Sequence, residues 1–227
     1  LQKAIECYQE ALRVYTPEAA PLGYAMTQNN LGTAYADLPT GDRAANLEQA
    51  IACYQEALRF WTPEAAPLYY AGTQNNLGTA YQSLPTGDRA ANLEKAIQCY
   101  QEALRFYTPE AVPLDYAMTQ NNLGLAYLHL PTGDRATNLK QSLHCVETAL
   151  QIKGLSPWEQ AEYLFTRGLA HLALGQQDQA LADYQAAMPL ADSITLAEAL
   201  KELNEFVAAH PDTPGLDALR TLFPSPS

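Results

Sequence analysis

The stretch TQNNLGTAY occupies Thr27–Tyr35 and returns unchanged at Thr73–Tyr81. A third copy, TQNNLGLAY, follows at Thr119–Tyr127 and differs at one position. The spacings between copies, 73 − 27 and 119 − 73, are both 46 residues. Self-similarity at a fixed period of this size indicates a stacked array of structural repeats. The repeat therefore decides the fold.

Each repeat contains two helical patterns. In the second pattern, apolar residues recur at three- and four-residue steps, as on one face of a helix. In one copy these residues are Leu93, Ala96, Ile97, Tyr100, Ala103 and Leu104. Asp88 can cap this helix, Thr108-Pro109 ends it, and Pro113 suits the first turn of the next helix. The pattern predicts an all-α unit of helix, turn, helix and turn.

These units resemble the tetratricopeptide repeat (TPR) family. The resemblance rests on Leu31-Gly32-x-Ala34-Tyr35 in the first helix and on Ala50-Ile51-x-x-Tyr54-x-x-Ala57-Leu58 in the second. It implies a right-handed solenoid of helical hairpins. A TPR unit usually has ~34 residues. The longer unit and its Asn-Asn-Leu motif resemble kinesin light chain and related bacterial proteins more closely.

The array has three expected parts. Residues 1–138 hold three near-identical repeats, residues 139–192 hold diverged units, and residues 193–227 hold a C-terminal capping helix and a short tail. We expect His210-Pro211 to end the capping helix. Because Leu1 begins in a helix of the second type, we expect a fragment of a longer repeat protein. Its uncapped N-terminal end is a candidate surface for self-association.

The charge of the chain limits the classes of partner that it can be expected to bind. A formal net charge of −12 without a basic stripe argues against binding nucleic acid or anionic membranes. No apolar run approaches the ~20 residues of a membrane span. The predicted partners are therefore proteins or peptides, and the predicted location is the cytoplasm.

The cysteines follow the same 46-residue period, at Cys7, Cys53, Cys99 and Cys145. Equivalent positions in stacked repeats lie ~8–10 Å apart, whereas a disulfide needs Cα atoms within ~7 Å. We therefore expect four small buried residues in reducing surroundings, with a metal site or redox thiol as the weaker alternative. No phosphate-binding loop, metal-ligand spacing or recurring catalytic arrangement is present, so neither an enzyme nor a cofactor is predicted.

The Asn pairs are the predicted peptide-binding residues. The resemblance implies that the first helix of each unit lines a concave groove. Helix spacing places the second Asn of each pair on the groove face, and its amide matches the donors and acceptors of an extended main chain. The candidates are Asn30, Asn76, Asn122, Asn29, Asn75, Asn121, Thr33, Thr79 and Leu125. The alternative is that the Asn pairs form hydrogen bonds with neighbouring helices and contact no ligand. For the first Asn of each pair, the sequence favours neither of the two alternatives.

The C-terminal end of the predicted groove is apolar. Its residues are Leu125, Leu128, Phe165, Leu169 and Leu172. Either the terminal helix buries them or they form a pocket for a partner's anchor side chain. The groove lacks the basic residues that grip a C-terminal carboxylate. The predicted function is an interaction scaffold; the alternatives are a self-associating architectural array and the sensor arm of a larger bacterial signalling or protease protein.

Overall fold

The computed structural model describes residues 1–209, 213 and 216–223, and all regular structure within them is α-helical. The expected helix end at His210-Pro211 lies outside the described residues. The chain divides into two compact units, Leu1–Ala111 and Val112–Ser227, and each is described by itself.

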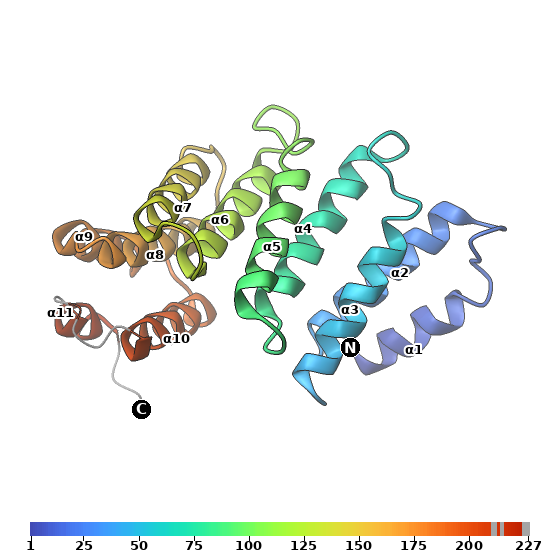
Figure 1. Ribbon diagram of the computed structural model, residues 1–227, viewed down its shortest axis with the longest axis horizontal. Coiled ribbons are helices and arrows are strands. Elements are labelled where there is room, and N and C mark those ends of the chain that lie inside the picture. Colours follow the sequence, from blue (N-terminus) through green and yellow to red (C-terminus); the bar gives the residue numbers. More distant parts are fainter. Residues whose placement is uncertain (210–212, 214–215, 224–227) are drawn as a thin grey trace. The chain divides into compact units, whose positions relative to one another are not determined.

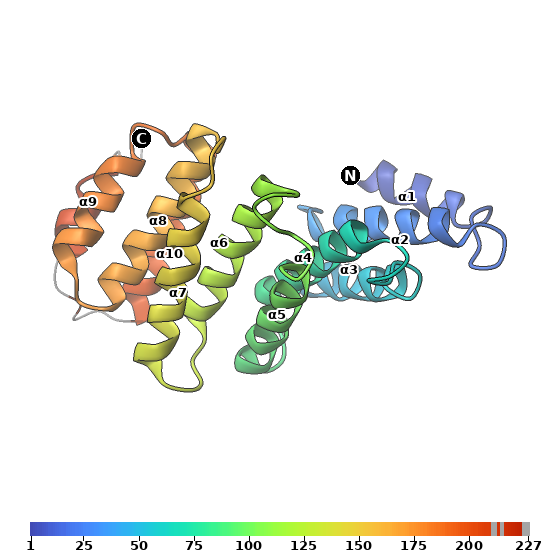
Figure 2. The ribbon, with the colours of Figure 1, turned by 90° about the horizontal axis from the view of Figure 1, so that it is seen from above.

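The first unit contains α1 (Gln2–Ala11), α2 (Pro21–Ala36), α3 (Arg43–Ala57), α4 (Pro67–Ser83) and α5 (Arg89–Ala103). Helix α2 pairs with α3 and α4 pairs with α5, while α3 packs against α4 (Figure 1). Helix α1 lies alongside α2 (Figure 2). The predicted alternation of two helix types is therefore present in this unit.

The second unit contains α6 (Pro113–His129), α7 (Arg135–Leu150), α8 (Pro157–Ala173), α9 (Gln177–Ala187), α10 (Ser193–Ala209) and α11 (Leu216–Arg220). The pairs α6–α7 and α8–α9 form hairpins, and α7 packs against α8. Helix α10 lies against α8 and α11 against α9 (Figure 1). The fold is the predicted all-α array of helical hairpins.

The helix starts follow the predicted signals. Asp88 caps α5 by accepting hydrogen bonds from the backbone N–H groups of Ala90 and Ala91, at 2.9 and 3.4 Å. Pro113 opens α6. The loop before α5 turns at Gly87, whose φ of +79° favours glycine. Asn92 then donates a 2.8 Å hydrogen bond to the carbonyl of Thr86 and closes the loop.

Close helix approach depends on small residues, as the sequence predicted. A Cβ atom added to Gly78 on α4 would lie 2.7 Å from Cε1 of Tyr100 on α5. Gly32 has the same relation to Tyr54, at 2.8 Å. Both rings are buried, so neither has room to move. A side chain on either glycine would push the two helices of its hairpin apart.

The cysteine prediction was only half right. Cys53 and Cys145 are buried, but Cys99 is partly exposed and Cys7 is exposed. Cys53 packs against Ile5 of α1 and residues of α2. Cys7 lies on the first helix and has no such contact. All four thiols are free, and burial raises the pKa of Cys53 to about 11 and of Cys145 to about 12.

Candidate functional site

The second Asn of each pair lies on a first-type helix and is partly exposed: Asn30 on α2, Asn76 on α4 and Asn122 on α6. In the first unit, Asn30 Oδ1 accepts a 3.4 Å hydrogen bond from Asn29 Nδ2, and Asn76 Nδ2 donates one of 3.4 Å to Asn29 Oδ1. Both bonds are long. Within the described residues, the Asn30 Nδ2 group and the Asn76 Oδ1 atom make no hydrogen bond.

The first Asn of each pair is more enclosed in the second and third copies, while Asn29 is partly exposed like Asn30. Asn29 Oδ1 accepts a 3.1 Å hydrogen bond from the hydroxyl of Thr73, so it bridges α2 and α4. Asn75 and Asn121 are buried. Asn121 Nδ2 donates a 3.0 Å hydrogen bond to Glu162 Oε1 on α8. These contacts give Asn29 and Asn121 a structural role between neighbouring hairpins, while their role in binding stays a prediction.

The two candidate threonines, Thr33 and Thr79, also form hydrogen bonds within the protein. The Thr33 hydroxyl donates to the carbonyl of Asn29 and accepts from the hydroxyl of Tyr54, both at 3.2 Å. Thr79 donates in the same way to the carbonyl of Asn75, and its Oγ1 lies 3.2 Å from the Tyr100 hydroxyl. Each threonine therefore ties its first-type helix to the buried tyrosine of the next helix.

Helix α10 covers the apolar residues at the end of the predicted groove. They are buried in one cluster with Ala199, Leu203 and Phe206 of α10. The members concerned are Leu125, Leu128, Phe165, Leu169 and Leu172. Of the two alternatives that the sequence left open, the structure shows burial under the terminal helix. Leu125 keeps 9% of its surface exposed, at the edge of a pocket.

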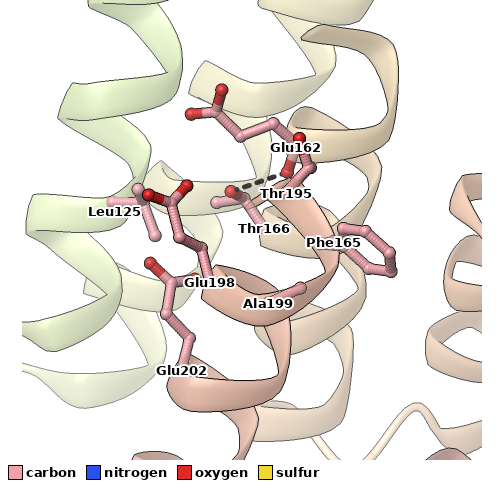
Figure 3. A pocket seen from close by; sticks show the side chains of 8 residues that line it. All are labelled: Leu125, Glu162, Phe165, Thr166, Thr195, Glu198, Ala199 and Glu202. Carbon is pink, nitrogen blue, oxygen red and sulfur yellow. Dashed lines mark hydrogen bonds between the residues drawn. The ribbon is translucent and has the colours of Figure 1, made fainter. Parts of the chain in front are cut away.

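This pocket was not predicted from the sequence. It lies between α6, α8 and α10, and the space there, open solvent included, is about 310 Å³. Its lining combines an apolar wall with three carboxylates and two threonines: Leu125, Phe165, Ala199, Glu162, Glu198, Glu202, Thr166 and Thr195. Figure 3 shows the carboxylates of Glu198 and Glu202 side by side, pointing from α10 toward Leu125.

The sequence carried a weak signal for these acids. Glu198 and Glu202 are four residues apart, so they share one face of a helix. Glu162 precedes Gly168 by six residues, as Met118 precedes Gly124 in the repeat before it. Neither observation shows that α8 and α10 bring the three acids together, because that depends on how the terminal helix docks.

The pocket raises the pKa of two of its carboxyls. Burial raises the pKa of Glu162 to about 7, with additions from the charges of Glu198 and Glu159. Burial also raises the pKa of Glu202 to about 7; Glu162, Glu198 and Glu205 raise it further, and Lys201 opposes them. Neighbouring carboxylates resist joint ionisation. The charged groups that act on this pair lie on α8 and α10.

Within the described residues, the carboxylates of Glu198 and Glu202 accept no hydrogen bond. The Thr166 hydroxyl donates to the backbone carbonyl of Glu162, at 3.1 Å (Figure 3). The Thr195 hydroxyl donates to Asp192, at 2.9 Å. The pocket therefore presents acceptors to whatever enters it.

A basic residue on α8 is already neutralised. Arg167 Nε lies 3.1 and 3.0 Å from the two carboxylate oxygens of Asp183 on α9, and Arg167 Nη2 also contacts this carboxylate. Asp183 is buried. This ion pair joins α8 to α9 and gives Arg167 a partner inside the fold.

Two further kinds of feature are absent from the described part of the chain. No group of three or more His, Cys, Asp or Glu side chains there is arranged to hold a metal ion. None of its helices combines the length and apolar character that a membrane span requires.

Comparisons with known proteins agree with this fold. A family model described as "SNAP: Soluble NSF attachment protein, SNAP" matches residues 3–213. A crystal structure of MamA superposes with a TM-score of 0.56 at 20% identity, covering 82% of this chain and 85% of MamA. A second MamA structure gives a TM-score of 0.52 at 18% identity, covering 84% and 93%. No curated protein sequence matches the chain.

Proposed function

Because the chain belongs to the soluble NSF attachment protein family, we propose that it is a protein–protein interaction scaffold that binds an extended segment of a partner. TPR-like helical-hairpin arrays are typical of such scaffolds. The proposed binding residues lie on first-type helices, α2 and α4 in the first unit and α6 in the second. They are the amides of Asn30, Asn76 and Asn122, which would contact the main chain of the partner.

One observation carries the proposal. Asn30 and Asn76 are partly exposed, and each keeps an amide atom that bonds nothing in the described protein: a donor on Asn30 and an acceptor on Asn76. An extended peptide offers one acceptor and one donor per residue, so both atoms can be satisfied by main chain. Asn29 contacts both side chains and holds them in place.

The stretched repeat supports the same assignment. The Asn-Asn-Leu motif recurs at a 46-residue period and resembles that of kinesin light chain. The resemblance implies a ladder of Asn side chains that clamps a main chain without reading its side chains. We assign the ladder to the second Asn of each pair and a supporting role to the first.

The test uses peptides selected from a random library displayed on phage. Their dissociation constants are measured by fluorescence anisotropy with the native chain and with the triple variant Asn30→Ala, Asn76→Ala, Asn122→Ala. We expect the triple variant to bind at least tenfold more weakly at an unchanged melting temperature. Asn204→Ala, at an exposed site on α10, is the control. Equal binding by the triple variant contradicts the ladder.

Self-association is the second candidate function. Leu1 and Val14, which flank α1, are large apolar residues with 55% and 72% of their surfaces exposed. Exposed apolar residues gain from burial against another chain. Light scattering at increasing concentration tests this alternative. A constant monomer mass rules it out, and a dimer lost on Val14→Asp supports it.

A further inference from the structure

The repeats change character on α8, at the positions that we assign to partner binding. Two residues before the glycine that contacts the following helix, three copies have an asparagine and the fourth has Thr166. One position earlier, Phe165 stands where the other copies have the first Asn. One residue after the glycine, two copies have a threonine, whereas Leu125 and Leu169 occupy this position on α6 and α8. We refer to Phe165, Thr166 and Leu169 as the α8 face, where the polar ladder gives way to apolar residues.

Helix α10 covers the α8 face. Phe165 is buried in one cluster with Leu203 of α10. Thr166 lines the same pocket as Thr195 of α10, and Figure 3 shows the two side chains close together. Thr166 is buried, whereas Asn122, at the equivalent position of α6, is partly exposed. Helix α10 therefore occupies the place that a partner segment would take on α8.

Helix α10 also shows which kind of segment the α8 face accepts. Its buried residues Ala199, Leu203 and Phe206 are four and three residues apart, so they form one apolar stripe along a helix. Lys201 and Asn204, which lie between them in the sequence, are exposed. Amphipathic helices that dock on apolar grooves use anchors at this spacing. The α8 face is therefore fitted to a helix and not to an extended chain.

The polar part of the contact opposes the docking of α10. Glu162 on α8 and Glu202 on α10 line the same pocket, and burial raises the pKa of both to about 7. On α6, Asn121 donates a hydrogen bond to Glu162, but its own Oδ1 is buried and accepts none within the described residues. The titratable groups that interact with this pair of acids are Glu159 on α8, Tyr184 on α9, and Glu198, Lys201 and Glu205 on α10. Neighbouring carboxylates of like charge repel each other, so apolar burial holds α10 against this repulsion.

We propose that α10 is an exchangeable occupant of the α8 face, and that an amphipathic helix of a partner, with apolar residues four and three positions apart, replaces it. The inference rests on the proposed function, because α8 is the first-type helix that follows the ladder. It adds a second mode of recognition, in which the ladder binds main chain and the α8 face binds an apolar helix. In the free protein, α10 competes with the partner and lowers its apparent affinity.

The first experiment uses a fluorescein-labelled synthetic peptide of residues 193–209 and measures its dissociation constant with the full chain by fluorescence anisotropy. Leu203→Ala in the chain weakens the docking of α10, so the peptide should bind this variant about tenfold more tightly than the native chain, or more. Ile194→Ala is the matched control, because Ile194 lies on the same helix with 68% of its surface exposed. It should behave as the native chain does. Equal affinity for the native and Leu203→Ala chains overturns the proposal.

Glu202→Gln in the chain should act in the opposite direction. It removes the repulsion from Glu162, so α10 should dock more firmly and the peptide should bind about threefold more weakly than to the native chain. The loss of a negative charge would by itself favour this acidic peptide, so weaker binding reports on α10. Glu64→Gln removes the same charge from an exposed site in the first unit and is the control. Equal affinity for the two variants would overturn the role of the carboxylates.

Hydrogen exchange followed by mass spectrometry locates the opening. In Leu203→Ala, exchange should accelerate in α10 while α6 and α7 keep their protection, and in Glu202→Gln it should slow in α10. Accelerated exchange in all three helices of Leu203→Ala would mean that this variant unfolds the second unit, and the comparison of Glu202→Gln with Glu64→Gln then decides.

Failure of this proposal is distinct from failure of the Asn ladder. If the triple variant of Asn30, Asn76 and Asn122 leaves library peptides bound, the ladder fails, while the peptide of residues 193–209 still tests the α8 face. If that peptide shows no preference for the Leu203→Ala chain, the exchange of α10 is excluded, while the library peptides still test the ladder.

Discussion

The side-chain oxygen of Asn29 on α2 accepts a 3.1 Å hydrogen bond from the hydroxyl of Thr73 on α4. Both residues belong to the repeated TQNN motif, but to different copies of it. The first Asn of one copy therefore contacts the Thr that opens the motif in the next copy. The same oxygen is 3.4 Å from Nδ2 of Asn76. Part of the Asn pair thus couples the repeats within the first unit.

Asn29→Ala should destabilise the protein by about 1 kcal/mol, because Thr73 and Asn76 each lose a partner. Thr73 keeps its 2.9 Å bond to the carbonyl of Tyr69, which limits the loss. Asn30→Ala should change stability by less than about 0.5 kcal/mol, as for most surface substitutions. Urea unfolding of both variants measures the difference. Equal values would contradict a structural role special to Asn29.

Gly78→Ala should destabilise the protein by about 1–3 kcal/mol, as overpacking does in a filled core. The new Cβ would be 2.7 Å from the buried ring of Tyr100. Gly23→Ala is the matched control, since its Cβ would be 3.3 Å from Tyr15, an exposed side chain that can move. Thermal unfolding compares the two. A Gly78→Ala variant as stable as the control would mean that the hairpin tolerates a wider spacing.

Stability should fall as the pH rises from about 4.5 to about 7. In this range, Glu162 and Glu202 hold protons in the folded protein, where each pKa is about 7, but release them on unfolding, where the ordinary value is 4.5. The folded state binds more protons, so its free energy of unfolding decreases with pH and then levels off. A rise in the pKa of one glutamate from 4.5 to about 7 corresponds to at most about 3 kcal/mol in the free energy of unfolding.

The Glu202→Gln variant tests this explanation. Because glutamine carries no charge, the variant should lose less stability between pH 5 and pH 8 than the native chain, by about 1–3 kcal/mol. Glu64→Gln should follow the native curve. Urea unfolding at several pH values gives both results, and a Glu202→Gln curve that parallels the native one would exclude the pocket as the source.

Arg167→Met should destabilise the protein by about 3 kcal/mol, because it leaves the buried carboxylate of Asp183 without its guanidinium partner. The comparison variant is Arg59→Met, which breaks an exposed 2.8 Å pair with Glu56. Such surface pairs contribute less than about 1 kcal/mol. Thermal unfolding ranks the variants, and similar losses would indicate that the α8–α9 ion pair is no stronger than a surface pair.

The four thiols should differ in their rate of reaction with a disulfide reagent. Cys7 is exposed and should react first. Burial raises the pKa of Cys53 and Cys145, which keeps both in the unreactive thiol form and out of reach. They should react only on unfolding. Mass spectrometry after short labelling identifies the modified sites, and early labelling of Cys145 would contradict its burial.

The sequence by itself determined the repeat, the helix types and their caps. The period of 46 residues, the cap at Asp88, the proline at Pro113 and the close contact at Gly32 all follow from local signals. Such signals act between residues that are near in sequence or in equivalent positions of adjacent helices. This is why they could be derived without coordinates.

Only the tertiary structure decided which copies of a repeated residue are buried and what α10 covers. Cys7 and Cys53 have nearly the same local sequence, but Cys7 is exposed whereas Cys53 is buried against residues of α1 and α2. Likewise, the packing of α10 against α8 brings Glu162 and Glu202 together and desolvates them, which raises the pKa of both carboxyls. Burial and pKa depend on atoms distant in sequence, and no local pattern encodes these contacts.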